Sequence, residues 1–571
     1  MDRKFPLVER RRNFLESLIE LFRRDPDFQS TVAGLRNSLT EQLVSGLTGT
    51  ARILYVASLY REINKHILLV THNLNQAQKA AEDLVELLPR DEVLLYPANE
   101  LVTTEIALAG HETLGQRIDV LSKLSQGFSG VFVVPFAGLR KLFPPRNVLK
   151  NSHTLLKVGD EQPIDPLTEH LVKIGYERVD MVEKPGEISV RGGILDVYPP
   201  PFDNPIRIEW FGDEVDSIRS FSVANQRSIE KLDRVLLPPA TELFASRESL
   251  DSAAEKVSHL LEDRLQKVKD PTVIEKMKDT ITWEIEQMRA GTLFTGIYKY
   301  ISEIYPDYQS LLDYLPEDTV MVLDEPARIL ETARQMEREE GEWQTALLAQ
   351  GEFLPQLKIS FSYEELLMNT RRPRIYLALF MRQVSGTNPQ NIVQFICRSM
   401  QQFHGQMHVL KAEWDRWKKA DYRVVFTASS RERAERLQRV LHDYGMEVET
   451  QGILTVGRPS IFIGAPLNGF ELAGIRLALI TEGEVFTQKQ RRPRRITQID
   501  HGEKIKDYQD LKPGDYVVHV NHGIGRYLGV ETLKVEGMHK DYLLIQYAGN
   551  DKLYVPIEQI DQVQKYIGSE E

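Results

Sequence analysis

The sequence has few of the residues and segments from which several common protein classes are built. It contains one cysteine in 571 residues, which excludes internal disulfides and cysteine-based metal sites. Its 13 histidines include no HExxH or comparable ligand spacing, so we expect no bound metal. No apolar run approaches the roughly 20 residues needed to span a bilayer. The first residues also lack an apolar stretch followed by a small-residue cleavage site, and we expect a cytoplasmic protein without membrane contact.

Positive charge is scarce as well. The formal net charge of -12 argues against a chain that coats duplex DNA, because neutralising phosphates requires a basic face. The exception is QKQRRPRRITQIDHGEK, where basic residues surround Pro493, and we expect an exposed linker there. These residues are Lys489, Arg491, Arg492, Arg494 and Arg495. Two interpretations stay open, a solvated connector or a weak contact with DNA or RNA.

The order of apolar patterns predicts an α/β protein of about four domains. Buried-strand patterns such as HILLVTHN and DEVLLYPA flank an amphipathic helix, which is typical of a parallel sheet. Short strands and turns then indicate an inserted α+β module. A second α/β tract follows, with RIYLALF, YRVVFTAS, SIFIGAP and IRLALITEG as its strands. Alternating strands near the end, among them YVVHV, YLLIQYA and KLYVP, predict a small β-barrel.

These patterns place the boundaries at 1–123 and 206–350 for the two parts of the first α/β domain, 124–205 for the inserted module, 355–485 for the second α/β domain, 486–505 for the linker and 506–571 for the barrel. The single cysteine, Cys397, lies in NIVQFICRSM. We interpret that segment as helical and the thiol as buried and inert. We assign no role to the second α/β domain.

The stretch SGLTGTARIL has the glycines and threonines of a loop that binds phosphate. Gly46 and Gly49 would make the tight turn, but Ala51, Arg52 and Ile53 stand where such a loop ends in Gly-Lys-Ser/Thr. The compact ammonium and the hydroxyl that binds Mg²⁺ are therefore absent. The matching carboxylates would be Asp324 and Glu325, which follow the buried strand VMVL. We interpret SGLTGTARIL as scaffold and expect no cofactor and no catalytic residue in this chain.

The order and spacing of these segments resemble the excision-repair protein UvrB. SGLTGTARI is similar to its ATP loop, THN to its next helicase segment and VMVLDEPAR to its acidic motif. YPANELVTTEIALAGHE passes directly to a helix, without the tyrosine-rich hairpin of that family. The segments HGIGRY and LYVP resemble the CarD-type domain. Together these features resemble the first part of the bacterial transcription-repair coupling factors.

The resemblance implies a fold, namely a degenerate helicase-like α/β domain of UvrB homology, the inserted α+β module, the second small α/β domain and a Tudor/SH3-like C-terminal barrel. It implies that the inserted module binds UvrA, with matching positions at Arg178, Arg191, Arg207 and Glu209. Ser189 stands where UvrB has a further arginine.

The resemblance also implies that the barrel binds the β subunit of RNA polymerase through an edge strand containing Val530, Thr532, Leu533 and Lys534. The family continues into a DNA translocase motor whose motifs are absent here, so we expect a longer parent protein. DNA contact would then come through that motor, or weakly through the linker. The expected function is a transcription-coupled repair adaptor. The alternatives are a divergent UvrB-like ATPase and a CarD-like regulator whose UvrB-like part is inert.

Overall fold

The computed structural model describes residues 5–99, 111–294, 296–381, 384–450, 454–464 and 468–486, and in the C-terminal region residues 502–504, 511–519, 523–535, 538–547, 552–556 and 563–566. The chain divides into two compact units, Met1–Thr487 and Gln488–Glu571. The five basic side chains of the predicted linker and the segment where the UvrB-type hairpin would lie, residues 100–110, are outside the described residues.

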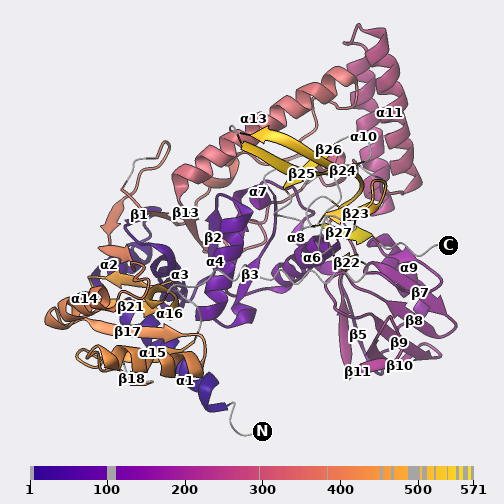
Figure 1. The fold of residues 1–571 in the computed structure, drawn as a ribbon. Coiled ribbons are helices and arrows are strands. Elements are labelled where there is room, and N and C mark those ends of the chain that lie inside the picture. Colours follow the sequence, from indigo (N-terminus) through magenta and orange to yellow (C-terminus); the bar gives the residue numbers. More distant parts are fainter. Residues whose placement is uncertain are drawn as a thin grey trace. The chain divides into compact units, whose positions relative to one another are not determined.

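A seven-stranded sheet organises the first unit (Figure 1). Its strand order is β15-β1-β14-β13-β2-β4-β3, and each neighbouring pair is parallel, as the sequence predicts. The strands are β1 (Glu41–Ser45), β2 (Ile67–Thr71), β3 (Val93–Leu95), β4 (Val131–Pro135), β13 (Val320–Asp324), β14 (Arg374–Ala378) and β15 (Asn391–Gln394). Runs such as ILLVT and VFVVP are buried at every position, because helices cover both faces of a parallel sheet.

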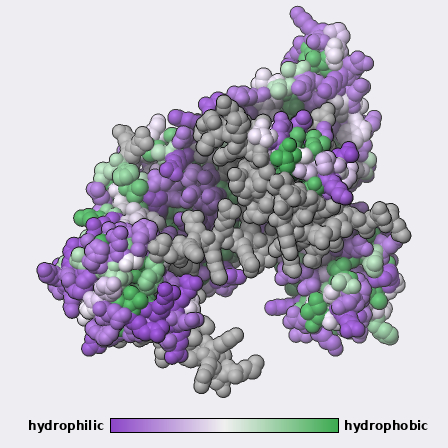
Figure 2. All heavy atoms as spheres, in the orientation of Figure 1, coloured by the Kyte–Doolittle hydropathy of each residue, from purple (hydrophilic) through white to green (hydrophobic). Residues whose placement is uncertain are grey.

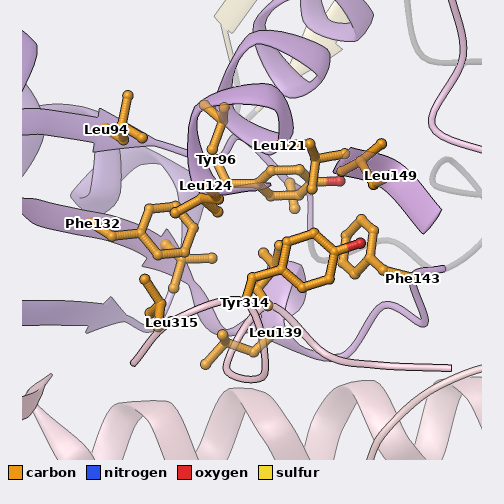
Figure 3. Close-up of a cluster of buried hydrophobic side chains, with 14 of the residues drawn as sticks. Leu94, Tyr96, Leu121, Leu124, Phe132, Leu139, Phe143, Leu149, Tyr314 and Leu315 are labelled. Atoms are coloured by element: carbon orange, nitrogen blue, oxygen red, sulfur yellow. The ribbon is translucent and has the colours of Figure 1, made fainter. Parts of the chain in front are cut away.

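Two hydrophobic clusters lie against this sheet. The surrounding helices are α1 (Phe5–Arg23), α2 (Pro26–Arg36), α3 (Gly49–Ile63), α4 (Leu74–Leu87), α6 (His111–Gln126), α7 (Phe136–Leu139) and α8 (Arg146–Ser152). In one cluster Tyr96 and Phe132 pack with Leu121 and Leu124 of α6 and with Tyr314 (Figure 3). Large buried rings dominate the burial of apolar area, so this cluster stabilises the β3-β4 side of the sheet.

The segment around Cys397 is extended, so the predicted helix is wrong. Residues 391–394 form β15 at the edge of the parallel sheet, and β16 (Cys397–Ser399) lies at the edge of a second sheet. Val393 and Phe395 are buried, whereas Ile392 and Ile396 are exposed, which is the period of two that a strand requires. The Cys397 thiol is half-buried, and this burial raises its pKa; that the thiol is inert stays a prediction.

The predicted domain limits at 205 and 355 do not coincide with the limits of the sheets that the strands form. RIYLALF contains β14, which pairs with β1 and β13 of the first sheet and not with the second α/β domain. The limit at 205 falls between β8 and β9, which are hydrogen-bonded neighbours. Single-strand patterns do not show which strand a segment pairs with, because pairing joins residues far apart in the chain.

The inserted module is built on a six-stranded sheet in the order β11-β10-β9-β8-β7-β6. A two-stranded ladder and one helix, α9 (Ile164–Lys173), accompany it. The strands of the sheet are β6 (Glu177–Arg178), β7 (Glu187–Arg191), β8 (Ile194–Val197), β9 (Ile206–Phe211), β10 (Glu214–Phe221) and β11 (Ser228–Leu232), and those of the ladder are β5 (Thr154–Lys157) and β12 (Arg234–Leu237). The core side chains Ile188, Leu195 and Ile208 alternate with outward polar residues, as in a sheet with one solvated face.

The long helices α10 (Arg247–Leu265) and α11 (Pro271–Ala290) pack against each other around a hydrophobic cluster of their own. A third long helix, α13 (Pro326–Gln350), starts directly after β13, packs on the parallel sheet with its first half and reaches this cluster with its last residues. The short α12 (Ile301–Ile304) packs against α10. A buried carboxylate, Glu284, joins α11 to the next segment, where Lys299 Nζ lies 2.7 Å from Oε1 and the Tyr300 hydroxyl donates to Oε2. These partners compensate the buried charge of Glu284.

The second sheet has the order β16-β20-β21-β17-β19-β18. Its further strands are β17 (Arg423–Ala428), β18 (Glu449–Thr450), β19 (Ser460–Ile463), β20 (Phe470–Leu472) and β21 (Leu477–Thr481), and its helices are α14 (Met407–Lys419), α15 (Arg431–Asp443) and α16 (Glu482–Val485). Phe14 of α1 stacks on Phe462 of β19 with ring centroids 3.9 Å apart. Residues of both sheets belong to one hydrophobic cluster, so the second sheet shares a core with the first.

Glu471 on β20 accepts hydrogen bonds from Arg398, Arg416 and Trp417. Burial alone would raise its pKa, but these donors outweigh burial and lower the pKa from 4.5 to about 2. A depressed carboxylate pKa contributes stability that is present above pH 4.5 and is lost as the pH falls toward 2.

We expect Glu471→Gln to lower the free energy of unfolding at pH 7 by about 2 kcal/mol, less than the full pKa shift implies, because both arginines stay partly solvated. The difference from the wild type should shrink as the pH falls from 4.5 to 3. Denaturant titrations of both proteins at pH 7 and pH 3 measure the difference in free energy of unfolding. An equal difference at the two pH values would contradict a stabilising role of the ionised Glu471.

The second unit contains antiparallel strands in the order β22-β27-β23-β24-β25-β26. They are β22 (Gly502–Lys504), β23 (Tyr516–His519), β24 (Gly523–Val535), β25 (Met538–Gln546), β26 (Lys552–Pro556) and β27 (Val563–Tyr566). Val517, Tyr527, Leu543 and Ile545 form its core with Val555. The predicted alternating strands are present. Closure into a barrel stays a prediction, because among the described residues β22 and β26 lie at opposite ends of the strand order.

Candidate functional site

The loop after β1 makes a tight turn into α3. Gly46 has a φ of +90°, and a Cβ there would lie 2.1 Å from the carbonyl oxygen of Phe395, so the position requires glycine. Gly49 also has a positive φ, +42°, and starts α3. Ala51 and Ile53 are buried in the hydrophobic cluster that α3 shares with the sheet. Both replacements thus contribute to packing.

Arg52 connects this loop to the acidic pair after β13. Its Nη1 donates to Asp324 Oδ1 at 2.5 Å, and its Nη2 donates to Glu325 Oε1 at 2.8 Å and to the carbonyl oxygen of Leu47 at 3.2 Å. The Arg52 and Asp324 side chains are only 14% and 17% exposed. One guanidinium therefore pairs with both carboxylates that would assist a magnesium-bound nucleotide in a working site.

The electrostatics of this cluster favour a charged Arg52. Burial lowers the pKa of the guanidinium, but Asp324 and Glu325 offset burial and leave that pKa above its usual value. Burial raises the pKa of Asp324, and Arg52 opposes that rise. Within the described residues no group of three or more histidine, cysteine, aspartate or glutamate side chains could hold a metal ion.

Glu325 holds the adjoining strand end. Its backbone lies in the left-handed region, with a φ of +57°, and its N-H donates to the carbonyl oxygen of Leu377 at 2.8 Å. Its carboxylate accepts from the N-H of Leu379 at 2.9 Å. Together with Arg52, these contacts join the carboxyl ends of the neighbouring strands β1, β14 and β13.

The inserted module brings together three of the four residues predicted to bind UvrA. Arg191, Arg207 and Glu209 project from β7 and β9 on the solvated side of the six-stranded sheet, with Asp196 of β8 between them. We call Arg191, Asp196, Arg207 and Glu209 the arginine face. Arg178 is exposed on the edge strand β6, in register with the buried Ile188 and not with Ser189 or Arg191. The strand register therefore separates Arg178 from the arginine face.

Hydrogen bonds within the module hold the side chains of the arginine face. Arg207 donates from Nε and Nη2 to the two oxygens of Asp196 at 2.7 and 2.8 Å, and Arg191 Nη2 donates to the same carboxylate at 3.0 Å. Glu209 accepts from Ser217 Oγ at 3.0 Å and from Arg219. The hydrogen bonds to Asp196 raise the pKa of Arg207. The face thus consists of two neighbouring hydrogen-bonded groups, one centred on Asp196 and one on Glu209.

Sequence reasoning missed the residues that support this network. Asp196 pairs with Arg207 in register, and Gln226 and Phe221 contact the Arg207 guanidinium, with the ring centroid of Phe221 4.3 Å from Cζ. The alternation in ILDV could have identified Asp196 as an outward residue of a strand. Figure 2 shows the surface of this module as hydrophilic spheres with apolar ones among them. Phe211, at the end of β9, is 83% exposed.

The segment predicted to bind RNA polymerase lies in β24. Its residues 529–535 pair with β25, whereas β23 pairs only with residues 523–526. Among the described strands, β23 therefore does not extend along residues 529–535. Val530 is 41% exposed and Thr532 is exposed. The side chains of Leu533 and Lys534 lie outside the described part of the structure.

Comparison with known proteins identifies two domains in the chain. The family model of the UvrB interaction domain matches residues 155–243, and that of the CarD-like/TRCF RID domain matches residues 511–567. The first match covers β5 to β12 and thus includes the arginine face. The second covers β23 to β27.

Curated relatives match almost the whole chain. A transcription-repair-coupling factor of Bacillus subtilis (strain 168) is 45% identical over 559 residues, which are 97% of this chain and 48% of the relative. One of Staphylococcus aureus (strain MRSA252) is 35% identical over 565 residues, 97% of this chain and 47% of the relative. The chain spans about half the length of the curated relatives it matches. None of the described helices is long and apolar enough to cross a membrane.

Proposed function

Since this chain is a relative of the transcription-repair-coupling factors over nearly its whole length, we propose that it is an adaptor which joins a stalled RNA polymerase to the repair protein UvrA. The observation that carries the proposal is the presence of a UvrB interaction domain and a CarD-like domain in one chain, in two separate compact units. Such an adaptor acts in the cytoplasm and needs no cofactor of its own.

The UvrA contact is proposed at the arginine face. Two arginines held by one buried carboxylate offer planar donors to acidic groups of a partner, and arginine forks bind carboxylates at two points. Phe211 adds an exposed aromatic ring on the strand that carries Arg207 and Glu209. Arg178 would extend the contact toward the sheet edge.

The polymerase contact is proposed at residues 529–535 of β24, with the β subunit as the partner. Among the described strands, β23 does not extend along this stretch, and a partner strand can add to such a sheet edge through backbone N-H and C=O groups. We also propose that the C-terminal unit closes into a Tudor/SH3-like barrel around Val517 and Leu543.

The ATP site of the UvrB-like domain is proposed to be lost, so this chain is not an enzyme and any motor belongs to the other half of the relatives' length. The support is Arg52, whose guanidinium already neutralises the two carboxylates. An incoming triphosphate would find arginine in place of the lysine at position 52 and no hydroxyl for Mg²⁺ at position 53.

Co-elution of the chain with UvrA and with the polymerase β subunit, separately and together, tests the proposal. We expect Val530→Glu to weaken β-subunit binding at least about 10-fold, because a carboxylate would be buried without a partner in the complex only. UvrA binding should not change. Lys552→Gln, at an exposed position of β26, lowers the net charge by the same one unit and is the matched control for charge. Unaltered β-subunit binding by Val530→Glu would move the contact away from this strand.

A further inference from the structure

Asp196 is the buried centre of the arginine face. Its side chain is 2% exposed, and its register partners on the neighbouring strands are Ser189 and Arg207. Both of its oxygens are used: Oδ1 accepts from Arg207 Nε, and Oδ2 accepts from Nη2 of Arg207 and of Arg191. A single carboxylate therefore fixes two cationic side chains that come from different strands.

The two arginines retain donors for a ligand. Arg207 uses Nε and Nη2 within the module, and no described acceptor takes a hydrogen bond from its Nη1. Arg191 is 52% exposed and uses only Nη2. Each guanidinium has five N-H groups in a rigid plane, so fixing one edge orients the other. The Phe221 ring on one side and Gln226 further limit the orientation of Arg207.

We infer that Asp196 is the positioning residue of this surface, which holds Arg191 and Arg207 in one arrangement that receives a carboxylate of the partner. The inference rests on the proposed binding of UvrA at the arginine face. Arg219, which pairs with Glu209, lies beside Arg207 on the same side of the sheet. With it, three arginines and two carboxylates leave one net positive charge, which favours an acidic group on the partner. Pre-organised side chains lose less conformational entropy on binding, so the contribution of Asp196 should appear in the dissociation rate.

Asp196→Asn in the full chain tests this role by surface plasmon resonance on immobilised UvrA. We expect UvrA to dissociate about 10-fold faster, because the amide has one accepting oxygen instead of two and its NH2 group would face a guanidinium donor. The association rate should stay equal or rise, since one negative charge has been removed beside the arginines. Asp216→Asn, at an exposed position of β10, removes the same charge without touching either arginine and should leave both rates unchanged.

A double-mutant cycle separates positioning from simple stabilisation of the fold. In an Arg207→Lys background, Asp196→Asn should add less than about 3-fold to the loss, because the fork that it orients is already gone. Additive losses would show that Asp196 acts independently of Arg207 and would overturn the inference. Unchanged dissociation by the folded Asp196→Asn variant would overturn it as well.

Folding of the variant is checked by its melting curve. If Asp196→Asn does not fold, Gln226→Asn gives a second test, because asparagine tolerates the left-handed backbone at this position (φ +59°) but is too short to reach Arg207. A 2- to 3-fold faster dissociation is expected there, and no change would contradict positioning. If variants of Arg191 and Arg207 themselves leave UvrA binding intact, the proposed function of the face fails, which is a different outcome from failure of Asp196 alone.

Discussion

Replacing Arg52 by alanine should lower the free energy of unfolding of the parallel-sheet domain by about 3–5 kcal/mol, the usual cost of removing one partner of a buried ion pair. The reason is that Asp324 and Glu325 would lose their shared cation at a position where the Asp324 side chain is only 17% exposed. Hydrogen exchange of the amides in β1 and β13, which the pair connects, measures the effect.

Two further variants identify the cause of that loss. Arg52→Lys keeps the charge but cannot bond both carboxylates in one plane, so it should cost less than alanine. Adding Asp324→Asn and Glu325→Gln to Arg52→Ala should recover part of the stability, because no uncompensated charge remains. A loss below about 1 kcal/mol for Arg52→Ala would show that the cluster is effectively solvated.

Calorimetric titration of the wild type with Mg-ATP should give no binding heat, and a micromolar dissociation constant would contradict the proposed loss of the ATP site.

Combining Arg191→Ala with Arg207→Lys should weaken UvrA binding at least about 100-fold, since both arginine forks of the proposed contact are lost. The structure decides which substitutions are informative. Arg207→Glu would place a second carboxylate against the buried Asp196 and destabilise the module, so a binding loss could not be interpreted. Lysine at position 207 keeps a cation beside Asp196 and removes only the planar fork. Binding of the double variant to UvrA is measured by calorimetry, next to its thermal melt.

Arg178→Ala is the comparison within the same module. Because Arg178 lies on β6 in register with Ile188, outside the network of Asp196, we expect this variant to change the affinity less than about 3-fold. Wild-type affinity in the Arg191→Ala, Arg207→Lys variant would locate the UvrA contact elsewhere on residues 155–243. A large loss of UvrA affinity for Arg178→Ala alone would instead place the UvrA contact at the edge strand β6.

Local patterns were sufficient for much of this protein. The parallel α/β sheet could be predicted because its strands are apolar at successive positions, and the relation to the coupling factors because motifs such as SGLTGTARI and HGIGRY are contiguous. The sequence alone also shows that Arg52 and Ile53 stand where a phosphate-binding loop has lysine and serine or threonine. Each of these inferences depends on residues within a few positions of one another.

Only the tertiary structure decided which distant segments meet. The pairing of Arg52 with Asp324 joins residues 272 positions apart, and it places one cation against the acidic pair that follows β13. Strand pairing placed β14 in the first sheet and Arg178 apart from Arg191, and it placed Asp196 between Arg191 and Arg207. The segment at Cys397 formed two edge strands because each of them found a partner, β1 and β20, far away in the chain. Such contacts depend on the sum of long-range packing and hydrogen bonding, which no local pattern of residues contains.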